Sequence, residues 1–294
     1  MWPDDRGMAY KPSRMLVIPF PAIDPVLIQI GPFGIRWYAL SYIAGLVLGW
    51  WYIRALIKTA RLWTGPVFGG KAPAKPEQID DFVLWATLGV ILGGRLGYLL
   101  FYGFIYYPDE FFGDPLKAFK IWEGGMSFHG GLLGVVLAIV FYARAVKIDM
   151  FKLGDLVAAA TPIGLFFGRL ANFINGELWG KPADVPWAMV FPNAEPAGVP
   201  RHPSQLYEAA LEGLVLFVIL RVMISRFRAL DRPGLVTGTF LAFYGLFRAV
   251  SEIFRDSEAF IFSPDSGITM GMLLSLPMWA VAAFFFWRAF RKPA

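Results

Sequence analysis

The 294-residue sequence contains no cysteine, only two histidines and few charged residues for its length. Without cysteine the chain can form no disulfide, no thiolate metal site and no cysteine nucleophile. His129 and His202 are too few for a multi-histidine metal centre, so we expect no metal and no cofactor. Charged residues make up 17% of the chain, below the roughly 25% usual in soluble domains, which argues against a soluble protein.

Apolar residues dominate instead, at 57% of the chain with a mean hydropathy of +0.54. Several apolar stretches reach the roughly 20 residues that a helix needs to cross a bilayer. We therefore expect an all-α membrane protein, with one polytopic domain over 1–294 and about seven transmembrane helices. The predicted spans cover about residues 37–57, 79–102, 128–146, 154–174, 205–224, 235–255 and 270–290.

The basic residues are distributed unevenly between the loops. If successive loops alternate between the two sides of the membrane, one side holds 15 lysines and arginines and the other holds 8. The richer side is expected to be cytoplasmic. We therefore predict a periplasmic N-terminus, a cytoplasmic C-terminus and small periplasmic loop elements at 103–127 and 175–204. This topology also explains the net charge of +5 without a nucleic-acid partner.

Three arginines, Arg95, Arg169 and Arg248, fall within or near the apolar segments. An arginine at membrane depth costs at least about 2.5 kcal/mol unless it is paired or hydrated, so each needs an explanation. A structural ion pair or a side chain that reaches the headgroups is the simpler explanation. A functional anion site is the other, and for Arg95 the sequence does not decide between them.

Arg248 belongs to a regular pattern with Tyr244, Glu252 and Arg255, which recur at intervals of four, four and three residues. This spacing places the four side chains on one helix face, where Arg248 and Glu252 can form an ion pair. The pattern is compatible with a helix-packing ion pair. It equally suits an anion site, because the planar guanidinium binds phosphate with two parallel donors.

Arg169, Asn172 and Glu177 form a denser polar run. Arg169 and Asn172 share a helix face if the segment is helical, and Asn175-Gly176 predicts that the helix ends there in a turn. His129 stands beside Gly130 and Gly131, and glycine allows a backbone or a ligand to approach closely. A lone histidine can equally be a core residue. His202 is compatible with an interfacial position, and Ser204 is a predicted N-cap of the fifth span.

These residues resemble the prolipoprotein diacylglyceryl transferase family. The matching runs are Arg36–Tyr38, Trp122–Leu132 (WEGGMSFHGGL), Gly168–Gly180 (GRLANFINGELWG), Arg201–Glu208 (RHPSQLYE) and the Tyr244, Arg248, Glu252, Arg255 pattern. They occur in the family's order and extend over about residues 30–256. One departure is Ala171, where glycine is more usual, and its small methyl group leaves the expected activity intact.

The resemblance implies a multi-pass enzyme of the bacterial inner membrane with its active site toward the periplasm. Such enzymes transfer the diacylglyceryl group of phosphatidylglycerol to the thiol of the lipobox cysteine in a prolipoprotein signal peptide. A thioether forms and glycerol 1-phosphate leaves, in the first step of bacterial lipoprotein maturation. No cofactor or metal is implied. The partners are therefore phosphatidylglycerol, signal peptides with a lipobox cysteine and membrane lipid, with no nucleic acid.

The resemblance also implies roles for single residues. Arg169 would bind the headgroup and Arg248 would lie beside the reacting phosphate, with His129 as the third catalytic residue. Asn172, Tyr38 and Glu177 would orient the headgroup, while Glu252 would hold Arg248. The other predicted substrate-binding residues are Tyr244, Arg255, His202, Arg95, Gly130 and Gly131.

Two questions remain open on the sequence. The thiol must lose its proton, either to His129 or because nearby arginines lower its pKa from about 8.5.

An anionic-solute or lipid transporter could also use buried arginines as a binding site, and a structural subunit could contain them as packing pairs. A transporter would show polar residues along several spans, whereas here the polar motifs concentrate at the outward ends.

Overall fold

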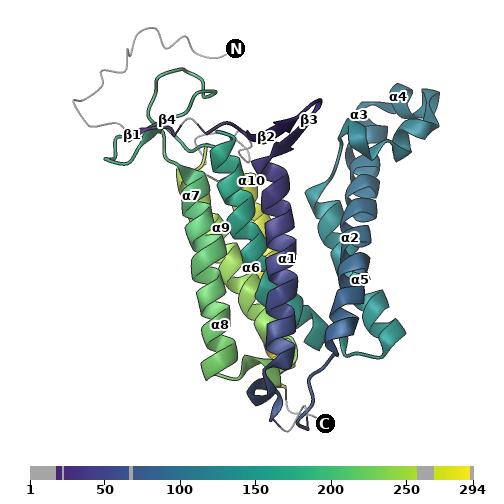
Figure 1. Ribbon diagram of the computed structural model, residues 1–294. Coiled ribbons are helices and arrows are strands. Elements are labelled where there is room, and N and C mark those ends of the chain that lie inside the picture. Colours follow the sequence, from purple (N-terminus) through teal and green to yellow (C-terminus); the bar gives the residue numbers. More distant parts are fainter. Residues whose placement is uncertain (1–17, 22, 66–68, 257–267, 292–294) are drawn as a thin grey trace. The chain divides into compact units, whose positions relative to one another are not determined.

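The computed structural model describes residues 18–21, 23–65, 69–256 and 268–291 (Figure 1). Helices cover every segment that the sequence predicts to span the membrane. They are α1 (Trp37–Lys58), α2 (Pro76–Tyr98), α3 (Phe104–Tyr106), α4 (Pro108–Gly113), α5 (Phe128–Val146), α6 (Met150–Ile174), α7 (Ser204–Glu208), α8 (Leu216–Arg226), α9 (Leu235–Phe254) and α10 (Met270–Phe290).

Short elements connect or extend these helices. A π-helical stretch, Leu99–Gly103, continues α2, and a second, Ala209–Val215, joins α7 to α8. The 3₁₀ turns are Ala60–Trp63, Pro115–Phe119, Ile121–Glu123 and Ala229–Asp231. Two small sheets are present among the described residues: β1 (Ile18–Pro19) pairs in parallel with β4 (Met189–Val190), and β2 (Val26–Ile30) pairs antiparallel with β3 (Phe33–Arg36).

The expectation of a helical membrane protein is confirmed. Within the described residues, five helical stretches are long and apolar enough to cross a membrane: Trp37–Lys58, Pro76–Tyr106, Phe128–Val146, Met150–Ile174 and Met270–Phe290. Many large apolar side chains on these helices point outward, such as Leu84, which is 62% exposed, as lipid-facing positions require. The count of seven spans and the orientation of the termini stay predictions.

The chain divides into two compact units that are interleaved in sequence. Unit 1 consists of Met1–Gly49, Thr161–Arg221 and Gly238–Phe284. Unit 2 consists of Trp50–Ala160, Val222–Thr237 and Phe285–Ala294.

In unit 2, α2 and α5 lie side by side along a seam of glycines (Figure 1). A Cβ atom added at Gly134 would lie 1.9 Å from the carbonyl oxygen of Gly89, and one at Gly130 would lie 2.3 Å from that of Gly93. Such close backbone approach is typical of membrane helices with small residues at their interface. The packing between the helices therefore requires glycine at these positions.

Asp155 of α6, also in unit 2, is completely buried and binds the beginning of α9. Its carboxylate accepts hydrogen bonds from the Gly234 amide at 2.7 Å and from the amide and hydroxyl of Thr237 at 2.8 and 2.7 Å. The first amides of a helix lack partners within the helix, and a carboxylate there also interacts favourably with the helix dipole. Asp155 thus fixes the start of the helix that carries Arg248.

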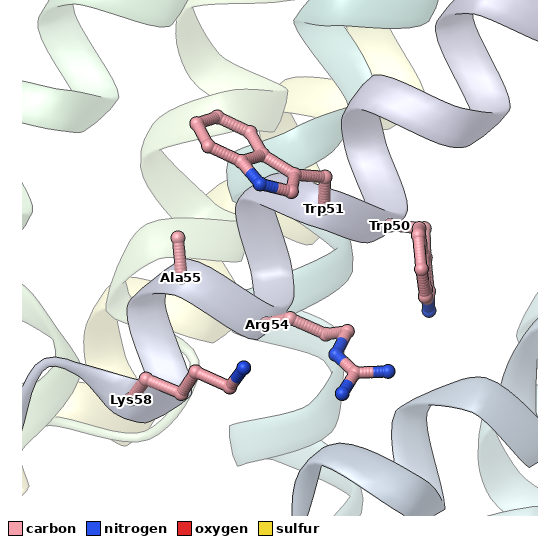
Figure 2. A pocket seen from close by; sticks show the side chains of 5 residues that line it. All are labelled: Trp50, Trp51, Arg54, Ala55 and Lys58. Atoms are coloured by element: carbon pink, nitrogen blue, oxygen red, sulfur yellow. The ribbon is translucent and has the colours of Figure 1, made fainter.

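The last turns of α1 form a pocket lined by Trp50, Trp51, Arg54, Ala55 and Lys58 (Figure 2). Arg54 pairs with Asp80 of α2 at 2.6 Å, and the Trp50 indole donates to the same carboxylate at 2.6 Å. Trp51 is 61% exposed. Tryptophan and basic side chains at a helix end are typical of the membrane–water interface.

In unit 1, α6 makes close contacts with α1 and with the helical run α7–α8. A Cβ atom added at Gly45 would lie 2.9 Å from the Cα of Gly164, and one at Gly213 would lie 2.7 Å from the Cβ of Phe166. The Trp279 indole of α10 donates to the carbonyl oxygen of Ala242 in α9 at 3.0 Å. These contacts bring the polar residues of α6, α7 and α9 together.

Candidate active site

The site begins where α6 ends. Arg169 and Asn172 lie in its last two turns, the helix stops at Ile174, and Gly176 has a positive φ of 63°. Because glycine adopts this conformation without strain, the predicted turn after the helix is confirmed. Asn172 then binds Glu177 twice: its carbonyl oxygen accepts from the Glu177 amide at 3.1 Å, and its side-chain amide donates to Glu177 Oε1 at 2.7 Å.

The segment after this turn is attached to the first turn of α7. The side-chain amide of Gln205 donates to the Glu177 carbonyl oxygen at 2.6 Å, and the Ser204 hydroxyl donates to the Leu178 carbonyl oxygen at 3.0 Å. The prediction that Ser204 is an N-cap is wrong. Pro203 occupies the cap position, with no side-chain cap hydrogen bond, because the Ser204 hydroxyl is used by the neighbouring segment.

Glu208 and Glu212 come from the π-helical region between α7 and α8. Glu208 is the last residue of α7, and Glu212 lies within the π-helical stretch Ala209–Val215. Their side chains are 1% and 0% exposed, respectively. π-helical turns are rare and frequently occur at functional sites. Two buried carboxylates thus face the residues on α6 and α9.

Glu208 contacts three arginines. Its Oε2 lies 2.7 Å from Arg169 Nη2 and 3.3 Å from Arg248 Nη1, while its Oε1 lies 3.2 Å from Arg255 Nη1. Glu212 extends the contact, with its Oε2 3.4 Å from Arg169 Nη2 and its Oε1 3.9 Å from Arg248 Nη1. Two buried carboxylates therefore hold guanidinium groups from separate segments in one place.

Glu252 of α9 completes the group. It pairs with Arg248 four residues earlier, as the sequence predicts, and its Oε1 lies 3.8 Å from Arg255 Nε. We call this set of six side chains the arginine cluster: Arg169, Arg248, Arg255, Glu208, Glu212 and Glu252. Its three positive and three negative formal charges balance. This balance reduces the cost of burial, since isolated buried charges are expensive.

Exposure differs between the two halves of the arginine cluster. The three glutamates are at most 2% exposed, whereas the three arginine side chains are 17–18% exposed. The carboxylates are therefore fully covered, and the guanidinium groups are the more accessible part of the arginine cluster. Guanidinium groups prepositioned in this way suit a phosphate, which accepts paired donors.

Two tyrosine hydroxyls feel the charges of the arginine cluster. The charges of Arg169, Arg248 and Glu212 act on the Tyr244 hydroxyl of α9. On α1, the Tyr38 hydroxyl lies 3.5 Å from that of Tyr42, and the charges of Arg169 and Glu177 act on Tyr42. The Tyr42 hydroxyl is the donor in its contact with Tyr38.

The connection between α6 and α7 is fixed by Arg201, which is 3% exposed. Its Nη1 lies 2.5 Å from Asp256 Oδ2 and donates to the Gly180 carbonyl oxygen at 3.3 Å, and its Nη2 donates to the Glu195 carbonyl oxygen. Gly180 has no room for a side chain, since an added Cβ would lie 2.5 Å from the carbonyl oxygen of Phe254. This network attaches the connection to the end of α9, next to Arg255.

His202 belongs to the same connection. Its Nδ1 lies 3.0 Å from the Tyr207 hydroxyl, which also accepts a hydrogen bond from the Trp187 indole at 2.7 Å. Burial and, to a lesser extent, the Lys181 charge lower the pKa of His202 below its usual value. The neutral imidazole is therefore favoured, as expected for a residue that stabilises the connection through its hydrogen bond.

The remaining predicted site residues lie in unit 2. His129 is exposed in the first turn of α5, and its ring packs edge-on against that of Phe128 with a centroid distance of 5.5 Å. Gly130 belongs to the glycine seam with α2, and Gly131 is also buried. Arg95 donates hydrogen bonds to four backbone carbonyl oxygens, and its guanidinium group lies over the Tyr98 ring, 5.5 Å from the ring centroid. Their roles toward substrate stay predictions.

Comparison with known proteins identifies the family. A sequence model described as "Prolipoprotein diacylglyceryl transferase" matches residues 25–288. The chain belongs to this family. It is 57% identical over 263 residues to the phosphatidylglycerol–prolipoprotein diacylglyceryl transferase of Rhodopseudomonas palustris, covering 89% of this chain and 88% of that protein. It is 52% identical to the enzyme of the same name from Phenylobacterium zucineum, covering 94% of this chain and 96% of that protein.

Family membership agrees with the resemblance found in the sequence, and all predicted site residues fall within the matched range. Three residues of structural importance were not predicted as site residues. Glu208 and Arg201 belong to the Arg201–Glu208 run, whereas Glu212 lies outside every motif that the sequence shows. The sequence signal that could identify Glu212 is a carboxylate inside an apolar span, four residues after the carboxylate of Glu208. Among the described residues, no group of histidines and carboxylates is arranged to hold a metal ion.

Proposed function

We propose that this protein transfers the diacylglyceryl group of phosphatidylglycerol to the thiol of a lipobox cysteine in a prolipoprotein signal peptide. Membership of the transferase family and the names of relatives more than 50% identical support this activity. The observation that carries it in the structure is the arginine cluster. Three partly exposed guanidinium groups, backed by buried carboxylates, suit an anionic phospholipid headgroup at membrane depth.

The reaction is a substitution at a saturated carbon. The sulfur attacks the carbon of the diacylglycerol unit that bears the phosphodiester oxygen, so that a carbon–sulfur bond forms as the carbon–oxygen bond breaks. Glycerol 1-phosphate leaves with the bonding electrons, and the thiol gives up its proton. Arg169 and Arg248 would stabilise the charge that develops on the leaving oxygen, a contribution that is large when donors are prepositioned in a site shielded from water.

Hydrogen-bonding groups beside the arginines would orient the headgroup. Asn172 and Glu177 are fixed to each other at the end of α6, and Tyr38 and Tyr244 present phenol hydroxyls. Glu208 and Glu252 would hold the guanidinium groups so that their donors point toward the phosphate. The excess of basic residues in one set of loops supports a location in the bacterial inner membrane with the site toward the periplasm.

His129 would accept the proton of the thiol. Histidine is the commonest general base in enzymes, and the thiol that must lose its proton has a usual pKa of about 8.5. A His129→Gln variant is expected to be slow at neutral pH and to recover as the pH rises toward about 8.5, where the thiol ionises without a base. The measurement is the rate of transfer between pH 6 and 9. A variant whose pH profile parallels that of the unmodified protein would exclude His129 as the base.

The function itself is tested with purified protein, phosphatidylglycerol and a lipobox peptide. We expect a thioether-linked diacylglyceryl peptide and glycerol 1-phosphate in equal amounts, detected by mass spectrometry. A peptide with serine in place of the cysteine is the matched control and should give no product, because a hydroxyl is far less acidic and less nucleophilic. Folded protein that forms no product would exclude the transferase function and leave the anion or lipid transporter as the alternative.

A further inference from the structure

Arg95 of α2 is a buried arginine whose hydrogen-bond acceptors are backbone carbonyl oxygens, and it lies over the Tyr98 ring at 5.5 Å from the centroid. It is 7% exposed, and its guanidinium group donates hydrogen bonds with all three of its nitrogen atoms. Nε donates to the Ala118 carbonyl oxygen at 2.8 Å, and Nη2 to that of Lys117 at 2.5 Å. Nη1 donates to Gly124 at 2.6 Å and to Gly125 at 3.0 Å. Four of the five N–H donors of the guanidinium group are thus used by the protein itself.

These four carbonyl groups belong to two parts of one segment, residues 114–125, which we call the Arg95-bound segment. Ala118 lies in a 3₁₀ turn near its beginning, while Gly124 and Gly125 form its end. Gly125 has a φ of 79°, and a Cβ added there would lie 2.5 Å from the Tyr98 ring and 2.9 Å from Arg95 Nη1. The guanidinium group therefore connects both ends of the segment to α2.

The end of the Arg95-bound segment leads directly into the helix that carries His129. The amide of Ser127 donates to the Gly94 carbonyl oxygen at 2.9 Å, next to Arg95. Ser127 is also the N-cap of α5, because its hydroxyl accepts from the Gly130 amide at 3.2 Å. His129 lies within this capped turn. The backbone that carries His129 is therefore held by contacts directly next to Arg95.

We propose that Arg95 is a positioning residue for His129: by holding the Arg95-bound segment against α2, it fixes the first turn of α5 and the direction of the imidazole. The effect on catalysis rests on the proposed function, in which His129 acts on the thiol. Lysine cannot replace Arg95 in this role, because a single ammonium nitrogen cannot reach carbonyl groups at both ends of the segment, whereas the guanidinium fork does. A positive charge at position 95 is therefore not sufficient without the geometry of the guanidinium group.

The first test measures the mobility of the Arg95-bound segment and does not depend on enzyme activity. Because the chain contains no cysteine, Phe119→Cys introduces a single site for a spin label, on a side chain that is 75% exposed in the Arg95-bound segment. Leu84→Cys, at a 62% exposed position of α2, is the matched label site. In an Arg95→Met background we expect narrower electron paramagnetic resonance lines from the label at 119 and an unchanged spectrum at 84. An unchanged spectrum at both sites would overturn the proposal.

The second test separates positioning from substrate binding through kcat and KM. Misplacing a catalytic group by about 1 Å can cost about 100-fold in rate, so Arg95→Met should lower kcat by up to that factor while KM for phosphatidylglycerol stays the same. Arg95→Lys should be as slow as Arg95→Met. Arg144→Met, at an exposed position of α5, is the control and should retain full activity. A raised KM with recovery in Arg95→Lys would show instead that Arg95 binds the anionic substrate.

A second variant keeps the proposal testable if Arg95→Met does not fold. Gly125→Ala retains the arginine, but its Cβ would lie 2.5 Å from the Tyr98 ring and 2.9 Å from Arg95 Nη1, so it should displace the end of the segment, mobilise the label at 119 and lower kcat in the same way. Unchanged label motion and kcat in Gly125→Ala would contradict the proposal. The spin-label result does not depend on any activity, so failure of the transferase assay and failure of the positioning role are distinguishable.

Discussion

The arginine cluster of unit 1 and Arg95 of unit 2 show two ways in which a membrane protein holds buried arginine. In the cluster, guanidinium groups pair with buried carboxylates and retain 17–18% exposure. Arg95 is 7% exposed and binds four backbone carbonyl oxygens. The first arrangement leaves donors accessible to an anion, whereas the second uses the donors to fix a segment of the chain.

The contrast shows that depth in the membrane does not by itself identify a binding residue. What distinguishes the two regions is the identity of the partners and the side from which the guanidinium group remains accessible. Each of the following changes should affect one region in a way that the other region does not share.

Replacing Arg248 should have the largest effect. Arg248→Gln removes a guanidinium charge from the place where the leaving phosphate develops charge, so we expect kcat/KM to fall about 1,000-fold. Transfer to a lipobox peptide is measured at saturating and limiting phosphatidylglycerol. Arg226→Gln, at an exposed position at the end of α8, is the control and should keep full activity. Near-normal activity of Arg248→Gln would remove the distinction between the arginine cluster and other buried arginines.

Glu208 and Glu212 should differ from each other. Glu208 contacts three arginines, the nearest at 2.7 Å, whereas the nearest arginine contact of Glu212 is 3.4 Å. Breaking one side of a buried charge pair costs 2–5 kcal/mol or more, so Glu208→Gln should lower kcat about 30-fold or more.

The KM for phosphatidylglycerol should not rise in Glu208→Gln, because the net positive charge that remains attracts the anion. Glu212→Gln is the matched comparison and should lose less activity. Steady-state kinetics of both variants at several lipid concentrations provides the measurement. A larger loss in Glu212→Gln would mean that Glu208 does not organise the arginines.

The sequence predicts helices better than it predicts partners. Helix α5 has the bounds 128–146 that its apolar run suggests, because hydropathy is a local property. The Arg248–Glu252 pair was also predictable, since four residues separate its members on one helix. The contact of Arg169 with Glu208 joins residues 39 positions apart and depends on how α6 and α7 pack, which no local pattern contains.

Arg95 is a second residue whose partners the sequence could not predict. Its sequence context could not decide between a structural and a functional role, because its partners are carbonyl groups, which every residue possesses. The side-chain pattern therefore gives no signal for such a contact. The Ser204 prediction was wrong for a related reason: a hydroxyl at a helix start can bind a distant segment instead of its own helix.

The smallest expected effect concerns stability in the glycine seam of unit 2. A methyl group at Gly134 would lie 1.9 Å from the Gly89 carbonyl oxygen, so Gly134→Ala must separate α2 from α5 and should destabilise the protein by about 1–3 kcal/mol. Gly164→Ala is the control, because nothing lies within 4 Å of the added Cβ. Thermal unfolding of both variants in detergent is the measurement, and equal melting temperatures would contradict the described packing of α2 on α5.

The central claim is that the arginine cluster, and not Arg95, binds the phosphate of the lipid substrate. A structure of the protein with bound phosphatidylglycerol tests this most directly. We predict phosphate oxygens at hydrogen-bond distance, about 2.7–2.9 Å, from the guanidinium nitrogens of Arg169 and Arg248, with Arg95 still bound to its four carbonyl groups. A phosphate bound by Arg95, with the arginine cluster paired only to its own glutamates, would contradict the account.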